Sequence, residues 1–159
     1  MHDLSLVVRV GEMLCAIPVG MVGETLRPLP VREVPGAASS DLPFLLGVAR
    51  VRGEATPVID LACLLGGRSR TDSYGRFVTV RPPGQRRCAV LAVDEVVDIR
   101  RLGAADPSGD TLPPLLSLVA AHAVERMSRL DRDFVLVLDS ARLVPDSVWA
   151  ASDAEGPAR

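Results

Sequence analysis

Short apolar runs recur along the chain and alternate with polar turns. The runs are rich in valine, leucine and isoleucine, and each has the length of one strand. Turn-forming residues separate them, as in Pro82-Pro83-Gly84-Gln85. The pattern predicts strands over residues 4–10, 13–17, 48–51, 56–61, 77–80, 88–93 and 134–138. Many short strands at this spacing are typical of an all-β barrel or sandwich, with helices that stay short.

Other stretches give weaker signals. Apolar residues at helical spacing predict two helical turns over residues 19–26, and residues 115–121 are expected to be irregular or a short helix. The proline-rich segment 28–43 is expected to be an extended loop and residues 66–74 a flexible joint. Residues 124–130 are expected to be a strand, because they mirror residues that enter a hairpin in the first half.

Two apolar signatures each occur twice, in the same order. The Cys-Ala-Ile sequence at Cys15 is echoed 73 residues later by Cys-Ala-Val at Cys88. The apolar sequence around Asp60 is echoed 79 residues later around Asp139. One match could arise from shared composition, but two in the same order indicate an internal duplication.

Each half of the chain is near the lower size limit for a core of its own. Apolar residues make up 48 % of the chain and aromatic residues only 3 %, so the cores must be packed from aliphatic side chains. We expect one domain over residues 1–150. Its two subdomains would span about 14–75 and 76–150, with terminal strands open to exchange between them, and residues 151–159 would form a flexible tail.

Composition argues against several classes of function. A net charge of −2 and scattered aromatic residues give no footprint for nucleic acid. No apolar run is long enough to span a bilayer, and the first residues lack a secretory leader, so a cytoplasmic protein without direct membrane insertion is expected.

Candidate chemistry is sparse. All 18 basic residues are arginine, and without lysine the chain has no phosphate-loop or Schiff-base lysine. The three cysteines and two histidines are not spaced in the sequence as metal ligands usually are, and the cysteines are interpreted as small buried hydrophobes. Asp60 and Asp139 end strands, so we expect them to cap the following turns rather than to act as catalysts. The sequence predicts no catalytic residue, cofactor or metal.

Arginine offers the best indication of binding. Arg50 and Arg52 are two positions apart in the predicted strand that leads into Gly53, so their side chains should share one face. Two interpretations remain open. The pair could be a solvated strand edge protected by charge, or a cationic patch offered to a protein partner.

The same segment resembles a known family. The sequence FLLGVARVRGE at residues 44–54, followed by PVIDL at 57–61, is similar to the central signature of CheW-type chemotaxis coupling proteins. The resemblance extends from about residue 4 to residue 144. In this segment Arg50 stands where the family usually has asparagine.

The resemblance implies a fold of two five-stranded SH3-like β-barrels related by approximate internal symmetry. It also implies an adaptor that catalyses nothing and joins the regulatory domain of a cytoplasmic histidine kinase to the membrane-distal tip of chemoreceptors, clustered with receptor arrays. Carried over by position, the partner-binding residues would be Arg52, Gly53, Gly47, Arg50, Val22, Glu24, Asp94 and Val97.

Two other functions stay open from the residues alone. A small-anion or metabolite sensor is suggested by the many arginines and by the cleft that two barrels would form. An enzyme that uses Asp60 or Asp139 is the third hypothesis.

Overall fold

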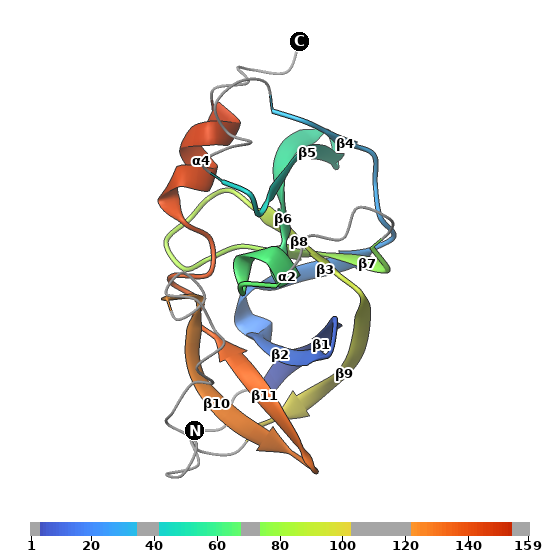
Figure 1. Ribbon diagram of the computed structural model, residues 1–159. Helices are drawn as coiled ribbons and strands as arrows, with labels where there is room; N and C mark the ends of the chain where they lie inside the picture. Colours follow the sequence, from blue (N-terminus) through green and yellow to red (C-terminus); the bar gives the residue numbers. More distant parts are fainter. Residues whose placement is uncertain (1–3, 35–41, 68–73, 103–121, 154–159) are drawn as a thin grey trace.

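Strands dominate the computed structural model, which describes residues 4–34, 42–67, 74–102 and 122–153 (Figure 1). The strands are β1 (Leu4–Val10), β2 (Met13–Pro18), β3 (Val22–Leu26), β4 (Val31–Arg32), β5 (Leu45–Val51), β6 (Glu54–Asp60), β7 (Arg76–Val80), β8 (Ala89–Val93), β9 (Glu95–Arg101), β10 (Val124–Leu130) and β11 (Asp133–Leu138). The short helices are η1 (Val19–Met21), α2 (Leu61–Leu64) and α4 (Asp146–Asp153). The predicted all-β class is confirmed.

Two mixed sheets make up the fold. Sheet A has five strands in the order β10-β11-β2-β1-β9, and sheet B has six in the order β3-β7-β8-β6-β5-β4. The prediction of two five-stranded barrels is therefore corrected: β4 adds a sixth strand to sheet B, and the hydrogen-bonded ladders among the described residues leave both sheets open. At each open seam a hairpin tip meets an edge strand, and side chains rather than backbone groups span the gap, through Arg52 and Glu24 in sheet B and through Asp131 and Arg100 in sheet A.

The sheets exchange strands. Hairpin β1–β2 lies in sheet A, but the next strand, β3, joins sheet B; hairpin β7–β8 lies in sheet B, but the next strand, β9, joins sheet A. Sheet B thus comes from the continuous segment 22–93, and sheet A from the two segments that flank it. The predicted boundary between two subdomains near residue 75 remains a prediction, because the hydrogen-bonded ladders change sheet elsewhere, between β2 and β3 and between β8 and β9.

The duplication is visible in hydrogen bonds. Asp60 N donates to the carbonyl of Phe44 at 2.8 Å, and Asp139 N donates to the carbonyl of Ala123 at 2.8 Å. Both donors and both acceptors are 79 residues apart. The β5–β6 and β10–β11 ladders also shift register at the same repeat position. Each sheet is therefore a structural copy of the other apart from β4.

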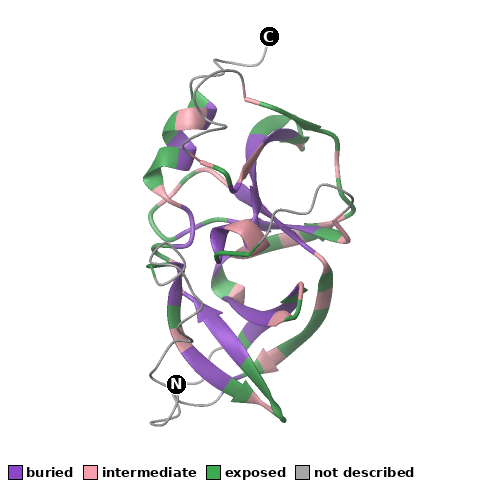
Figure 2. Ribbon diagram, viewed as in Figure 1, coloured by how far each residue is buried: buried purple, intermediate pink, exposed green. Residues whose placement is uncertain are grey.

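Three apolar clusters form the core, because the inner strands bury both of their faces (Figure 2). On β1, Leu6 and Val8 belong to a large central cluster between the sheets, whereas Val7 points to a smaller cluster within sheet A. On β7, Val78 joins the central cluster and Phe77 the cluster within sheet B. Period-2 alternation thus supplies one core per sheet and one shared core.

Several expected segments differ from the structure. Residues 19–26 form one 3-10 turn and strand β3 instead of two helical turns, since Val22 to Leu26 pair with β7. The loop 28–43 contains β4, and the first three residues of the expected tail belong to α4. Strand β10 is confirmed at residues 124–130. Residues 115–121 and most of 66–74 lie outside the described residues.

Candidate functional site

Arg52 occupies a backbone conformation that its residue type disfavours. Strand β5 ends at Val51, and Arg52 and Gly53 form the tip of the β5–β6 hairpin with φ angles of +50° and +84°. Two successive positive φ angles are typical of hairpin turns that select asparagine or glycine. A left-handed arginine costs about 1–2 kcal/mol relative to such residues. The turn conformation therefore does not explain why position 52 is arginine, so the reason is to be sought in the contacts of its side chain.

The Arg52 guanidinium is held by Glu24 on β3. Arg52 Nε donates to Glu24 Oε1 at 2.9 Å, and Nη2 donates to Oε2 at 2.7 Å. Hydrogen bonding to Arg52 lowers the pKa of Glu24, and hydrogen bonding to Glu24 raises the pKa of Arg52. The Arg52 side chain remains 79 % exposed and that of Glu24 29 % exposed. The pair is thus a two-point contact that fixes the guanidinium while leaving it accessible.

This ion pair joins two parts of sheet B that are not neighbours in the ladder. β3 and the β5–β6 hairpin are separated in the ladder by β7 and β8, yet the curl of the sheet brings Glu24 to the hairpin tip. Two residues that the resemblance placed at the partner surface are therefore adjacent in space. Their binding role stays a prediction.

Arg50 does not extend the pair into a free cationic patch. Its side chain is exposed, but its Nη1 donates to the carbonyl of Gly53 at 3.0 Å, within the same hairpin. Because Arg52 lies in the turn and not on the strand, the expectation of two arginines on one strand face is corrected.

The two glycines of the motif differ in their surroundings. Gly47 is buried at φ +144°, and a Cβ on it would overlap the carbonyl oxygen of Arg32 on β4. Gly53 has open space around it and needs only its positive φ. Gly47 therefore serves the packing of β4 on β5, whereas Gly53 serves the turn.

The three other predicted residues lie apart from one another. Val22 is half-buried against the central cluster. Asp94 follows β8, and its Oδ2 accepts a hydrogen bond from Gly11 N at 2.6 Å, which ties two turns together. Val97 on β9 is 40 % exposed. Among these three, only Val97 is exposed, whereas Val22 and Asp94 are half-buried.

The resemblance missed two apolar residues beside Val97. Ile99 is 55 % exposed on β9, and Leu4 is 43 % exposed on the neighbouring strand β1. Ile99 lies opposite Leu6, two positions along β1 from Leu4, so Leu4 and Ile99 share one face at the edge of sheet A.

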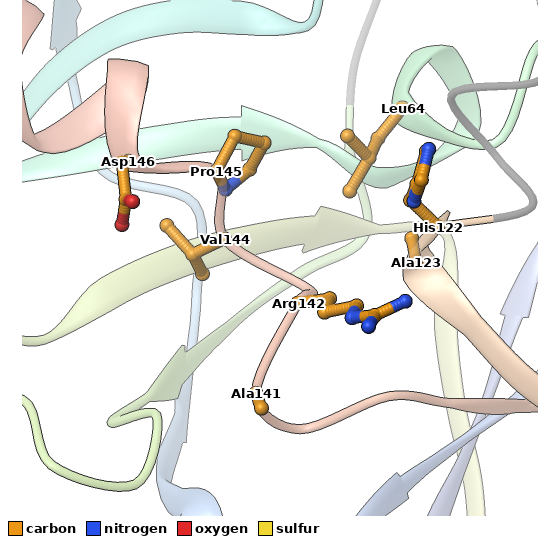
Figure 3. A pocket seen from close by; sticks show the side chains of 8 residues that line it. All are labelled: Leu64, His122, Ala123, Ala141, Arg142, Val144, Pro145 and Asp146. Atoms are coloured by element: carbon orange, nitrogen blue, oxygen red, sulfur yellow. The ribbon is translucent and has the colours of Figure 1, made fainter.

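A cleft of about 360 Å³ lies where elements of the two sheets meet (Figure 3). It is lined by the apolar side chains of Leu64 from α2 and Val144 before α4, and by the polar side chains of His122 and Arg142. This is the place that the metabolite-sensor hypothesis would use, and that hypothesis stays a prediction.

Potential metal ligands form no cluster in the part of the chain that the structure describes. No group of three or more His, Cys, Asp or Glu side chains there could hold a metal ion. Asp60 Oδ1 accepts from Cys63 N at 3.2 Å, and Asp139 Oδ1 accepts from Ala141 N at 2.9 Å. Both aspartates therefore cap turns, as predicted. No helix among the described residues is long and apolar enough to cross a membrane.

Comparison with known proteins agrees with the geometry. The model of the CheW-like domain family matches residues 5–148. The chain is 33 % identical over 100 residues to a protein named chemotaxis protein CheA from Cereibacter sphaeroides, a match that covers 62 % of this chain but 14 % of that protein. The crystal structure of the scaffolding protein TtCheW from Thermoanaerobacter tengcongensis shares the fold, with a TM-score of 0.69, 24 % identity and coverage of 87 % and 90 % of the two chains. The resemblance inferred from residues 44–61 is confirmed.

Proposed function

Because the chain belongs to the CheW-like domain family, we propose that it is a non-enzymatic adaptor that couples chemoreceptors to a chemotaxis histidine kinase. The partners would be the regulatory domain of the kinase and the cytoplasmic tip of the receptor. The similarity to a CheA protein supports the kinase as the partner system, although the chain spans only 14 % of that protein's length.

The ion pair of Arg52 and Glu24 is the observation that carries the proposal. A paired arginine usually loses its freedom to bind elsewhere, but the Arg52 side chain is 79 % exposed at a hairpin tip. Its carboxylate partner reduces the rotamer entropy that binding would otherwise cost, so the side chain is prepared for a second acceptor. The unfavourable turn conformation of Arg52 supports the same conclusion.

The surface fits a protein partner better than a small ligand. The Arg52 side chain is 79 % exposed at the hairpin tip, and the exposed apolar side chains of Leu4 and Ile99 offer a second contact area on sheet A. A specific interface takes about 800 Å² per partner, which two such areas could supply. Individual contacts of about micromolar strength would suffice when receptor and kinase are clustered.

The test uses Arg52→Glu, with Arg86→Glu as a control of equal charge change at another exposed arginine. Arg52→Glu should stay folded by circular dichroism and should fail to bring the kinase under receptor control in receptor-containing membranes. Arg86→Glu should couple like the wild type. Coupling at the wild-type level in a folded Arg52→Glu protein would refute the proposal.

A charge swap separates a binding role from a purely structural one. The double variant Glu24→Arg with Arg52→Glu can rebuild the ion pair within the protein but presents its charges reversed. If Arg52 contacts a partner, the swap should not restore coupling. If the swap restores coupling fully, the pair only stabilises sheet B and the proposed contact is wrong.

A further inference from the structure

Because the two sheets are structural copies, a comparison of equivalent positions shows which side chains the fold requires. Strand β3 carries a bulge in which Gly23 and Glu24 together lie opposite Thr79 of β7. Strand β9 carries the same bulge at the same repeat position, where Val97 and Asp98 lie opposite Val7 of β1. Differences between the two bulges show what the fold does not require.

Thr79 uses its hydroxyl to hold the backbone of Glu24. Thr79 Oγ1 accepts a hydrogen bond from Glu24 N at 2.8 Å and donates one to the Glu24 carbonyl at 3.4 Å. A bulge removes backbone groups from the ladder, and one buried hydroxyl here satisfies two of them on a single residue. Gly23 makes room for this contact, because a Cβ on it would lie 2.5 Å from Thr79 Oγ1.

Sheet A builds its bulge without any hydroxyl. Val7 has the shape of threonine with a methyl group in place of the hydroxyl, and it is fully buried. A valine side chain also occupies the position of Gly23, as Val97. The fold therefore requires neither the threonine nor the glycine at this point.

The remaining difference lies at the hairpin tips. Arg52 has Asp131 as its repeat counterpart, with φ +57°, and Glu24 has Asp98. Because both counterparts are acidic, a third residue is needed: Arg100 approaches Asp131 at 3.2 Å and Asp98 at 3.8 Å. Threonine thus occurs in the sheet where a single carboxylate must meet a single guanidinium.

We propose that Thr79 is a positioning residue of the docking surface: it fixes the backbone of Glu24 so that the carboxylate holds the guanidinium of Arg52 in a binding orientation. The inference rests on the proposed adaptor function for its consequence in binding, but the geometric part can be measured without any partner. The glycine at position 23 belongs to the same device, since a larger residue would displace the hydroxyl.

The first experiment measures the ion pair in the isolated protein. Thr79→Val installs the residue of sheet A, and Thr79→Ser keeps the hydroxyl. Thr56→Val removes another buried hydroxyl, which donates to the Glu54 carbonyl at 3.1 Å. The Nε–H signal of Arg52 in ¹⁵N NMR spectra reports the bond to Glu24. In Thr79→Val the solvent exchange of this proton should rise about three- to tenfold, as expected for the loss of one hydrogen bond.

In Thr79→Ser and Thr56→Val, the solvent exchange rate of the Arg52 Nε proton should stay within about twofold of the wild-type rate, which is less than the loss of one hydrogen bond would cause. All three variants should remain folded, because sheet A forms the same bulge with valine. An unchanged Arg52 signal in folded Thr79→Val would overturn the proposal.

The second experiment measures binding to the purified regulatory domain of the cognate kinase by calorimetry. Thr79→Val should weaken binding about three- to tenfold in the wild-type background and should have no further effect in the Arg52→Ala background. Equal losses in both backgrounds would mean that Thr79 does not act through Arg52. If the wild type does not bind the kinase domain, the adaptor function is refuted. The NMR experiment alone then decides whether Thr79 positions Glu24 and Arg52.

Discussion

Replacing Asp60 by alanine should destabilise the protein much more than replacing its repeat counterpart, Asp139. Asp60 is fully buried, and its two oxygens have different partners. Oδ1 accepts from Cys63 N at 3.2 Å, and Oδ2 accepts from the Tyr74 hydroxyl at 2.8 Å. Asp139 is half-buried and accepts only from backbone N–H groups of its turn, as far as the described residues show.

The magnitudes follow from these partners. Loss of a capping carboxylate costs about 1 kcal/mol, and this is the whole effect expected for Asp139→Ala. Asp60→Ala also removes the acceptor of the Tyr74 hydroxyl, and a hydrogen bond to a carboxylate is worth about 1.5–3 kcal/mol. Removing a buried carboxylate relieves part of its desolvation, so we expect a total of about 3 kcal/mol.

Urea unfolding, followed by the fluorescence of the single tryptophan, Trp149, measures both variants. Asp60→Ala should lower the midpoint without changing the slope, and its melting temperature should fall by about 6–12 °C. Asp60→Asn should lie between the wild type and Asp60→Ala because it keeps one acceptor. Equal losses for Asp60→Ala and Asp139→Ala would refute this account of the two caps. Loss of stability alone in both variants would also remove the enzyme hypothesis.

Three further predictions concern other parts of the fold. Arg87 lies over the Trp149 ring at 5.2 Å and contacts Asp153 of α4 at 2.6 Å. Arg87→Ala should therefore lower the free energy of unfolding by about 1–2 kcal/mol and shift Trp149 emission to longer wavelength. An identical effect of Arg86→Ala would contradict the role of this contact. Burial raises the pKa of Cys15 from 9.0 to about 12, so the thiol loses its proton at lower pH in the unfolded chain than in the folded protein. The free energy of unfolding should therefore fall between pH 9 and 12 by up to about 1.4 kcal/mol per pH unit. Urea titrations at several pH values measure this slope, and Cys15→Ala should lack it. Gly47→Ala should cost more than about 2 kcal/mol in thermal unfolding because its Cβ meets β4 backbone, whereas Gly53→Ala should cost about 1; the reverse order would disprove the packing role of Gly47.

The sequence could predict the strands whose two faces are both buried. In β1, β2, β8 and β11 nearly every residue is apolar, and turn residues mark the ends. The duplication was also readable, although the Cys15 echo was one residue out: the parallel ladders equate Ala16 with Val90, an offset of 74 rather than 73. Composition cannot fix a register to one residue when neighbouring positions are equally apolar.

Edge strands were the main failure. β9 is absent from the predicted strands because Glu95 and Asp98 interrupt its apolar positions. Edge strands carry such charges to prevent pairing with other chains, so the alternation of a half-buried strand is lost in them. β3 was interpreted as helix because Val19, Val22 and Leu26 have helical spacing, whereas its pairing with β7 decides its conformation. Long-range pairing of this kind leaves no local signal.

The candidate site shows the same limit. The resemblance identified Arg52 and Glu24 separately, but they are 28 residues apart on elements that the ladder separates by two strands. Thr79 could not be found at all, because a buried threonine in an apolar strand has no motif. Its meaning becomes visible only when the register sets it beside the Glu24 bulge and the duplicate sheet shows valine there.

Strand exchange gives the docking surface its particular position in the fold. Glu24 lies on β3, which leaves sheet A directly after β2 and pairs in sheet B, whereas Arg52 lies on a hairpin made wholly of sheet B residues. The ion pair therefore joins the connection between the sheets to the tip of one of them. A partner that pulls on Arg52 would strain β3 and, through the short η1 turn, the end of β2 in sheet A. The buried central cluster resists relative movement of the sheets, so such strain would be borne at the bulge, where the Thr79 hydroxyl forms hydrogen bonds with Glu24 N and with the Glu24 carbonyl.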